Sequence, residues 1–293
     1  MKGKPWLLHA LVTVAFWGVW GAFAGLPTEH GFPDTLVYVV WSLTMLPPMF
    51  VALWLAGWRL QLDRRSIYLG CMIGFTGAGG QMLLFHAVHT GPTYLIFPVI
   101  ALSPVITIGL SVLMLGERVS RVVAAGIVVA LVALPLFDYE PGGHLGGHGL
   151  EWFIEALVIM LAWGLQAFYI KLANRTMSAE SIFFYMTVTG LLLAPVALLM
   201  TDFHQPINYG WQGPGLAAIT QILNAVGVFT LVYAFRYGKA IVVSPLVNAG
   251  APLVTSVISL AWLGIMPLPL KTVALVLALV SAALLAIEPE EAP

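Results

Sequence analysis

Charged side chains are scarce in this chain. Only 9% of its 293 residues are Asp, Glu, Lys or Arg, whereas soluble domains carry about 25%. Hydrophobic residues make up 60%. A surface with so little charge excludes a soluble domain and indicates a polytopic membrane protein. The net charge of −1 also excludes nucleic acid as a partner held by bulk electrostatics.

Cysteine is nearly absent, because Cys71 is the one cysteine of the chain. This excludes a disulfide within the chain and a thiolate metal cluster. The sequence also lacks a Walker loop, a dinucleotide fingerprint and a nucleophile motif, so we expect no cofactor. No small-residue cleavage site follows the apolar run that begins after Lys4, which predicts a retained first helix and no cleaved signal peptide.

Long apolar runs are what the chain has in abundance. A membrane-spanning helix needs about 20 apolar residues. The sequence predicts ten such helices, at 6–26, 35–57, 67–89, 93–115, 120–137, 152–173, 181–200, 215–236, 240–262 and 270–287. The one long polar connection, 138–150, is rich in glycine and lies between the fifth and sixth helices.

One stretch of the chain occurs twice, at 85–118 and at 232–264. Residues that rarely match by chance recur at a shift of 147 or 148 positions: Gly91 with Gly238, Pro98 with Pro245, Pro104 with Pro252, Thr107 with Thr255, Ser111 with Ser259 and Gly116 with Gly264. Trp17-Gly18 similarly matches Trp163-Gly164. We infer an internal duplication into two five-helix copies, 1–137 and 151–288, joined by an outer linker at 138–150.

The basic residues predict how the chain crosses the membrane. With the N-terminus in the cytoplasm, Lys271 alone falls outside, and the other basic residues fall inside: Lys2, Lys4, Arg59, Arg64, Arg65, Arg118, Arg121, Lys171, Arg175, Arg236 and Lys239. This asymmetry predicts a cell-membrane protein with both termini cytoplasmic. Five helices per copy is an odd number, so the second copy is inverted. The expected fold is all-α, with ten transmembrane helices in two inverted five-helix repeats around a central cavity.

Prolines mark the fourth helix of each copy. Pro98 and Pro104 lie in the first copy, and Pro245 and Pro252 in the second. A proline removes a backbone hydrogen bond and clashes with the preceding turn. In lipid such a break survives only beside protein or a wet cavity. We therefore expect both helices to be broken, to border the cavity and to act as hinges.

Uncharged polar side chains occupy the interior of several predicted helices. Ser103 and Asn248 belong to polar stripes on the two proline-containing helices, and Gln81, Gln221 and Asn224 lie in apolar runs of the third and eighth helices. We take Gln81, Ser103, Asn224 and Asn248 as candidate substrate-binding residues. The alternative is that these side chains only join helices or bond back to their own backbone.

Aromatic residues lie near the middle of the first helix of each copy. Trp17 and Trp163 are far from the interfaces where tryptophan usually collects, and Gln166 shares a helical face with Trp163. We take Trp17, Trp20, Trp163 and Gln166 as further candidate substrate-binding residues. One interpretation is an aromatic wall that binds a flat or sugar-like substrate. The other is helix packing against Gly18 and Gly164.

Ionisable residues within the predicted spans are few. His86 and Glu155 are candidates for ion coupling, with protons as the candidate ion, because histidine titrates near neutrality and an intramembrane carboxylate is costly. The pairs His86–His89 and His144–His148, the latter in the outer loop with Asp138 and Glu140, have a spacing that can hold a metal, but a metal site usually needs a third and a fourth ligand and the spacing alone is not specific, so we expect no metal. An intramembrane enzyme that uses His86 and His89 with acidic partners is one alternative function, and a membrane sensor or scaffold is another.

These features together resemble the drug/metabolite transporter superfamily and its ten-helix EamA-type members. The resemblance covers nearly the whole chain and rests on the two halves, the Trp-Gly pairs, the proline-containing fourth helices and the segment 103–118. It implies a transporter whose cavity is lined by helices 1–4 and 6–9. The second copy departs from the pattern, with Ile265 where the first has Glu117. The expected partners are lipid and a small neutral or zwitterionic substrate.

Overall fold

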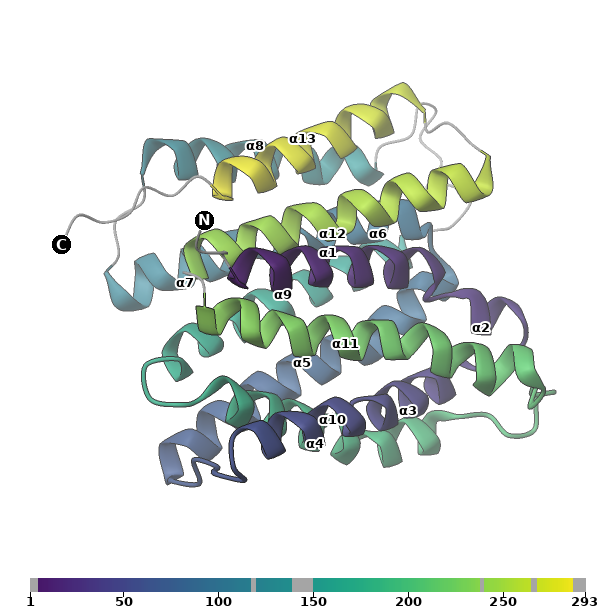
Figure 1. The fold of residues 1–293 in the computed structure, drawn as a ribbon. Helices are drawn as coiled ribbons and strands as arrows, with labels where there is room; N and C mark the ends of the chain where they lie inside the picture. The colour runs from purple at the N-terminus through teal and green to yellow at the C-terminus, as the bar shows by residue number, and fades with distance from the viewer. Residues whose placement is uncertain (1–4, 117–119, 139–149, 238–239, 265–267, 287–293) are drawn as a thin grey trace.

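A computed structural model describes residues 5–116, 120–138, 150–237, 240–264 and 268–286 (Figure 1). All regular elements in these ranges are helical. They are α1 (Pro5–Phe23), α2 (Leu26–Glu29), α3 (Asp34–Thr44), α4 (Leu46–Leu55), α5 (Arg64–Thr90), α6 (Thr93–Ile100), α7 (Pro104–Leu115), α8 (Arg121–Asp138), α9 (Glu151–Ala173), α10 (Ala179–Met200), a π-helical turn (Trp211–Gly215), α11 (Leu216–Tyr237), α12 (Ala240–Leu263) and α13 (Pro269–Ala286).

Eight segments of the described chain are long and apolar enough to cross a membrane. They correspond to the predicted helices one to four and six to nine, with the second formed by α3 and α4 and the fourth by α6 and α7. The other two predicted helices are α8 and α13, whose described apolar stretches are shorter. The multi-pass helical fold is therefore confirmed, and the number of ten spans stays a prediction.

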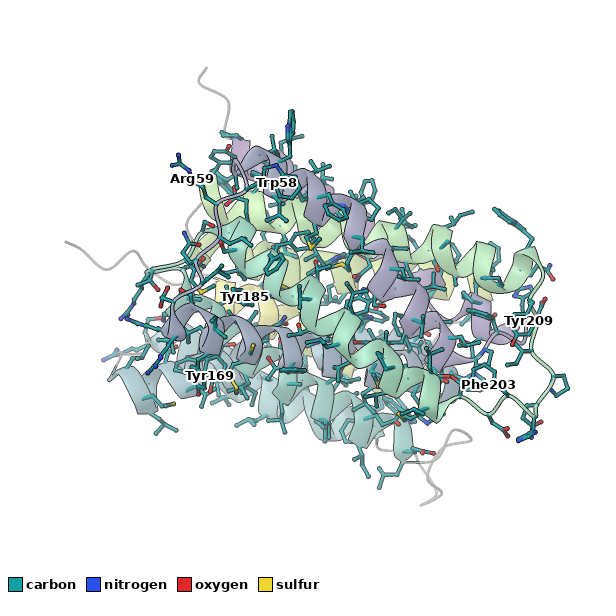
Figure 2. All side chains as sticks on the ribbon, turned by 90° about the horizontal axis from the view of Figure 1, so that it is seen from below. Trp58, Arg59, Tyr169, Tyr185, Phe203 and Tyr209 are labelled. Atoms are coloured by element: carbon teal, nitrogen blue, oxygen red, sulfur yellow. The ribbon has the colours of Figure 1, made fainter. Side chains whose placement is uncertain are left out.

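The two ends of the helical bundle differ in charge. One end, which we call the basic end, carries Arg59, Arg64, Arg65, Lys171 and Arg175. The other, the acidic end, carries Glu29, Asp34, Glu151, Glu155 and Asp202. Figure 2 shows Trp58, Arg59, Tyr169 and Tyr185 towards the basic end, and Phe203 and Tyr209 towards the acidic end.

The first helices of the two copies run in opposite directions. At the basic end, His9 near the start of α1 stacks on Tyr237 at the end of α11, with ring centroids 5.9 Å apart. At the acidic end, Glu155 near the start of α9 lies close to His86 near the end of α5. Helix α1 therefore runs from the basic to the acidic end and α9 runs back. This is the inversion that the sequence predicts.

The two copies are interlocked through these helices. Helix α1 packs against α11 and α12 of the second copy, and α9 packs against α5, α6 and α7 of the first. Helices α8 and α13 pack against each other at one edge of the bundle (Figure 1), where the Ser281 hydroxyl donates to the Gly126 carbonyl at 2.8 Å. Each first helix thus belongs structurally to the opposite copy.

The fourth helix of the first copy is broken, as predicted. Helix α6 ends at Ile100, and α7 begins at Pro104, whose ring would clash with the Ile100 carbonyl in a continuous helix. The Ser103 amide instead donates to that carbonyl at 2.9 Å, which makes a tightened turn. Pro98, in contrast, lies inside α6.

The corresponding prediction for the second copy is wrong, because α12 is helical throughout Ala240–Leu263, past both Pro245 and Pro252. Proline spacing supplies a physical reason. Seven positions are about two helical turns, so both missing hydrogen bonds fall on one side of α12, which can bend as one arc. Six positions, as between Pro98 and Pro104, leave the two defects about 120° apart around the axis.

Candidate functional site

Three helices meet at a group of side chains inside the bundle, which we call the central polar cluster: the half-buried Trp17 and the buried Trp20, Trp41, Gln221 and Asn224. The indole of Trp41 donates to Asn224 Oδ1 at 2.7 Å, and the indole of Trp17 donates to the Asn224 backbone carbonyl at 3.2 Å. One turn away, the indole of Trp20 donates to Gln221 Oε1 at 2.8 Å. The cluster therefore joins α1 and α3 of the first copy to α11 of the second.

The amide of Gln221 is satisfied on both sides. Its oxygen accepts from Trp20, and its Nε2 donates to the Thr220 hydroxyl at 3.4 Å. The residue is fully buried. Gln221 thus acts as an interhelical clasp, which was one of the two interpretations open for these amides.

Trp163 makes the same contact in the second copy that Trp17 makes in the first. Its indole donates to the Gly77 carbonyl at 3.3 Å, and its ring packs against Gly80 as that of Trp17 packs against Gly227. Gly80 and Gly227 are 147 positions apart, which is the shift of the repeat. Both rings need a residue without a side chain opposite them, so the two tryptophans have a packing role.

A second matched contact is made by each of the proline-containing helices. The Thr107 hydroxyl donates to the Gly164 carbonyl at 2.8 Å, and the Thr255 hydroxyl donates to the Gly18 carbonyl at 3.1 Å. Both threonines were matched by the repeat, but their partners could not be derived from spacing along one helix. Ser103 lies buried at the break itself, where its carbonyl faces Gly164.

Gln81 is the exception among the central amides. The residue is 4% exposed, and its Nε2 has no hydrogen-bond partner. Phe85 lies one turn along the same face of α5, and its ring centroid is 6.5 Å from that of Trp41. Gln81 therefore belongs to the face of α5 that packs on α3, beside the central polar cluster.

Two further candidates lie on the second copy. Gln166 is half-buried and packs against Gly77 of α5, one turn from Trp163. Asn248 is half-buried in α12 and has an interaction partner. The structure thus brings Gln166, Trp163 and Ser103 together around α5 and α7, and Trp17, Trp20 and Asn224 together around α11. Trp41 was missed, because it lies only about a third of the way along its apolar run and has no marked match in the other copy.

The two coupling candidates meet at the acidic end. His86 Nδ1 is 2.7 Å from Asp34 Oδ2, and its Nε2 is 3.6 Å from Glu155 Oε1 and 3.9 Å from Glu151 Oε1. The Thr90 hydroxyl donates to Glu155 Oε2 at 3.4 Å. Asp34 and Glu151 could not be predicted as members of this group, because their pairing depends on how the interlocked copies bring helix ends together.

The other histidines of the sequence analysis are not part of this group in the described chain. His89 is exposed and forms no contact with the three carboxylates. His144, His148 and Glu140 lie in the part of the linker, 139–149, that is outside the described residues, and Glu117 is also outside them.

Comparison with known proteins places the chain in a family. The profile of the EamA-like transporter family matches residues 4–137 and 150–287, on either side of the predicted linker. The chain therefore belongs to the EamA-like transporter family, and the resemblance to EamA-type members of the drug/metabolite transporter superfamily is confirmed. As a family of transporters, it favours transport over catalysis.

The fold is also found among solved structures. One structure, titled only "Crystal structure of protein", aligns over 100% of both chains with a TM-score of 0.66 and 17% sequence identity. At this identity the similarity supports the fold and carries no information about the substrate. No curated protein matches the chain in sequence.

Proposed function

We propose that this protein is a secondary transporter that moves a small neutral or zwitterionic metabolite across the cell membrane by alternating access. The side chains of the candidate residues Gln81, Ser103, Gln166, Asn224 and Asn248 are polar and uncharged, which suits such a substrate. The excess of Lys and Arg at the basic end supports an orientation with that end, and both termini, in the cytoplasm. The break at 101–103 supplies one point at which the bundle can bend. We propose no coupling ion.

The observation that carries the proposal is the unpartnered Nε2 of Gln81. A buried donor without an acceptor costs about 1–3 kcal/mol. In a transporter this cost is explained when the substrate supplies the missing acceptor. We therefore expect the substrate to present a carbonyl, hydroxyl or carboxylate oxygen to α5, next to the aromatic rings of Trp41 and Phe85.

The experiment is a thermal-shift screen of the purified protein against sugars, nucleosides and amino acids, followed by two matched substitutions. Gln81→Leu removes a donor that has no protein partner, so it should leave the thermal midpoint equal or higher while abolishing the shift caused by substrate. Gln221→Leu leaves the buried indole N–H of Trp20 without an acceptor. It should lower the stability by about 1–3 kcal/mol and preserve the substrate-induced shift.

Opposite results would count against the proposal. If Gln81→Leu binds substrate as the unsubstituted protein does, Gln81 is not a substrate-binding residue. If no flux of the identified ligand occurs in proteoliposomes, the sensor interpretation replaces transport. If the ligand is chemically converted and the His86→Ala variant loses this conversion, the enzyme interpretation replaces it.

A further inference from the structure

The imidazole of His86 is oriented by a carboxylate. Its Nδ1 lies 2.7 Å from Asp34 Oδ2, a distance typical of a charge-assisted hydrogen bond. The carboxylate of Asp34 can only accept, so the Nδ1–H donates. With Nδ1 protonated, the lone pair of a neutral ring lies on Nε2, on the side of the ring that faces α9.

Two carboxylates lie near this nitrogen. The distances from Nε2 to Glu155 Oε1 and Glu151 Oε1 are 3.6 and 3.9 Å, beyond the roughly 2.7–3.2 Å of a hydrogen bond. A lone pair and two anionic oxygens repel one another unless a positive charge lies between them. A tetrahedral ion with bonds of about 2.0–2.2 Å separates its ligand atoms by about 3.4 Å, which is close to the spacing found here.

We propose that the acidic end holds a binding site for a divalent transition-metal ion of the zinc class, with His86 Nε2, Glu155 and Glu151 as ligands and Asp34 as the residue that orients the histidine. These three ligand atoms all lie within 4.8 Å of one another. A histidine that ligates a metal commonly donates its other N–H to a carboxylate, as His86 does to Asp34. The expectation of no metal, drawn from spacing along the sequence, considered neither Glu151 nor Asp34.

The burial of the residues suits an ion that enters from water. The side chains of Glu155 and Asp34 are 12% and 19% exposed, whereas those of His86 and Glu151 are 44% and 68% exposed. One ligand is thus held firmly, with its second oxygen bonded to Thr90, and the others are open to solvent. Water fills the fourth position of a tetrahedral ion in this arrangement.

The site joins the two copies of the repeat. Asp34 and His86 lie on α3 and α5 of the first copy, while Glu151 and Glu155 lie on α9 of the second. A bound ion therefore fixes α9 to α5 at the acidic end. Under the proposed function, transport requires the two copies to separate at this end. A bound ion then stabilises the state in which the acidic end is closed.

The test measures metal binding to the full-length protein in detergent, purified without a polyhistidine tag and without substrate, so that its result is independent of the transport proposal. Zn²⁺ titration is followed by calorimetry, and Cu²⁺ by paramagnetic resonance for a single imidazole nitrogen. The starting protein carries His144→Ala and His148→Ala, which removes the linker histidines as ligands. We expect one saturable Zn²⁺ site per chain, with Mg²⁺ failing to compete.

Matched variants assign the ligands. His86→Ala should abolish saturable binding, and Glu155→Gln should weaken it. Asp34→Asn should lower the affinity by about 10–100-fold, as expected for a residue that orients a ligand, and restoring Asp should recover it. His89→Ala should bind like the starting protein. Thermal midpoints without metal show that each variant is folded.

The proposal is overturned if the folded starting protein shows no saturable Zn²⁺ binding. It is equally overturned if His86→Ala binds as tightly as the starting protein, or if His89→Ala loses the site in its place.

Discussion

Helices α6 and α7 of the first copy and α12 of the second are equivalent stretches with paired prolines, yet only the first is divided. Thr107 and Thr255 make the same contact with a glycine carbonyl of the opposite copy, so the helix after the second proline is held alike in both. The two stretches differ between their prolines, where α12 has one inserted residue. We interpret the inserted residue as the cause of the difference, because it changes the relative orientation of the two prolines around the helix axis.

The largest effect should come from substitutions that test what the copies share. A Cβ at Gly80 would lie 2.6 Å from the Trp163 indole nitrogen, and one at Gly227 would overlap the Trp17 ring. Gly80→Ala and Gly227→Ala should each destabilise the protein by about 1–3 kcal/mol through overpacking, measured as a lower thermal midpoint in detergent.

Gly79→Ala is the matched control, because a Cβ there meets no atom within 4 Å. It should be neutral or slightly stabilising, since alanine favours a helix. If Gly80→Ala and Gly227→Ala differed strongly from each other, the equivalence of the two tryptophan contacts would be contradicted.

The next effect concerns the proline difference itself. Pro104→Ala removes the residue that begins α7, whereas Pro252→Ala acts inside an unbroken helix. Both should lower the transport rate more than substrate affinity, with the larger loss for Pro104→Ala. Because the copies are inverted, the two variants should shift accessibility in opposite directions, which cysteine labelling from each side reports in a background lacking Cys71. Shifts in the same direction, or unchanged rates, would remove the hinge role.

A smaller effect is expected when the indole nitrogen is removed and the ring is retained. Trp17→Phe and Trp163→Phe each lose one hydrogen bond to a backbone carbonyl, at 3.2 and 3.3 Å. Each substitution should lower the stability of the protein by about 0.5–1.5 kcal/mol. The loss should be similar in the two copies and is measured as a lower thermal midpoint. Substrate affinity unchanged in both variants and in Trp17→Ala and Trp163→Ala would show that these residues only pack.

The smallest effect lies where the third helices of the copies begin. Helix α5 is capped by Asp63, the residue before its first turn, whose carboxylate accepts from the Arg65 and Ser66 amides and the Ser66 hydroxyl. Helix α11 instead follows the π-helical turn. The Ser66 hydrogen bonds lower the pKa of Asp63. A lowered folded pKa means that this stabilisation is present above the usual carboxyl pKa of about 3.9 and is lost as pH falls through the folded value.

Asp63→Ala should therefore lower the thermal midpoint slightly at neutral pH. The difference from the unsubstituted protein should shrink as the pH is lowered below the ordinary carboxyl range. A difference that stays constant down to that range would show that the carboxylate charge is not what caps α5.

Much of the fold could be predicted because its signals are local. Apolar length gives the spans, Lys and Arg distinguish the ends, and the matched Gly, Pro and Thr residues reveal the duplication. The candidate site was harder to predict from the sequence. Gln81 and Gln221 look alike in sequence, and only the packing of α1 against α11 shows that one amide is bonded and the other is not. Asp34 and Glu151 each begin a helix, as acidic residues often do, so nothing local marks them as partners of His86.

The interlocking of the copies also constrains how the protein is made. Trp17 emerges from the ribosome long before its acceptor Asn224, which follows 207 residues later. At about 5–20 residues per second this is a wait of roughly 10–40 s. During that time α1 is in the membrane without the helices it packs against. Neither half contains the helices against which its own first helix packs. The bundle can therefore be completed only after the last helices have been synthesised.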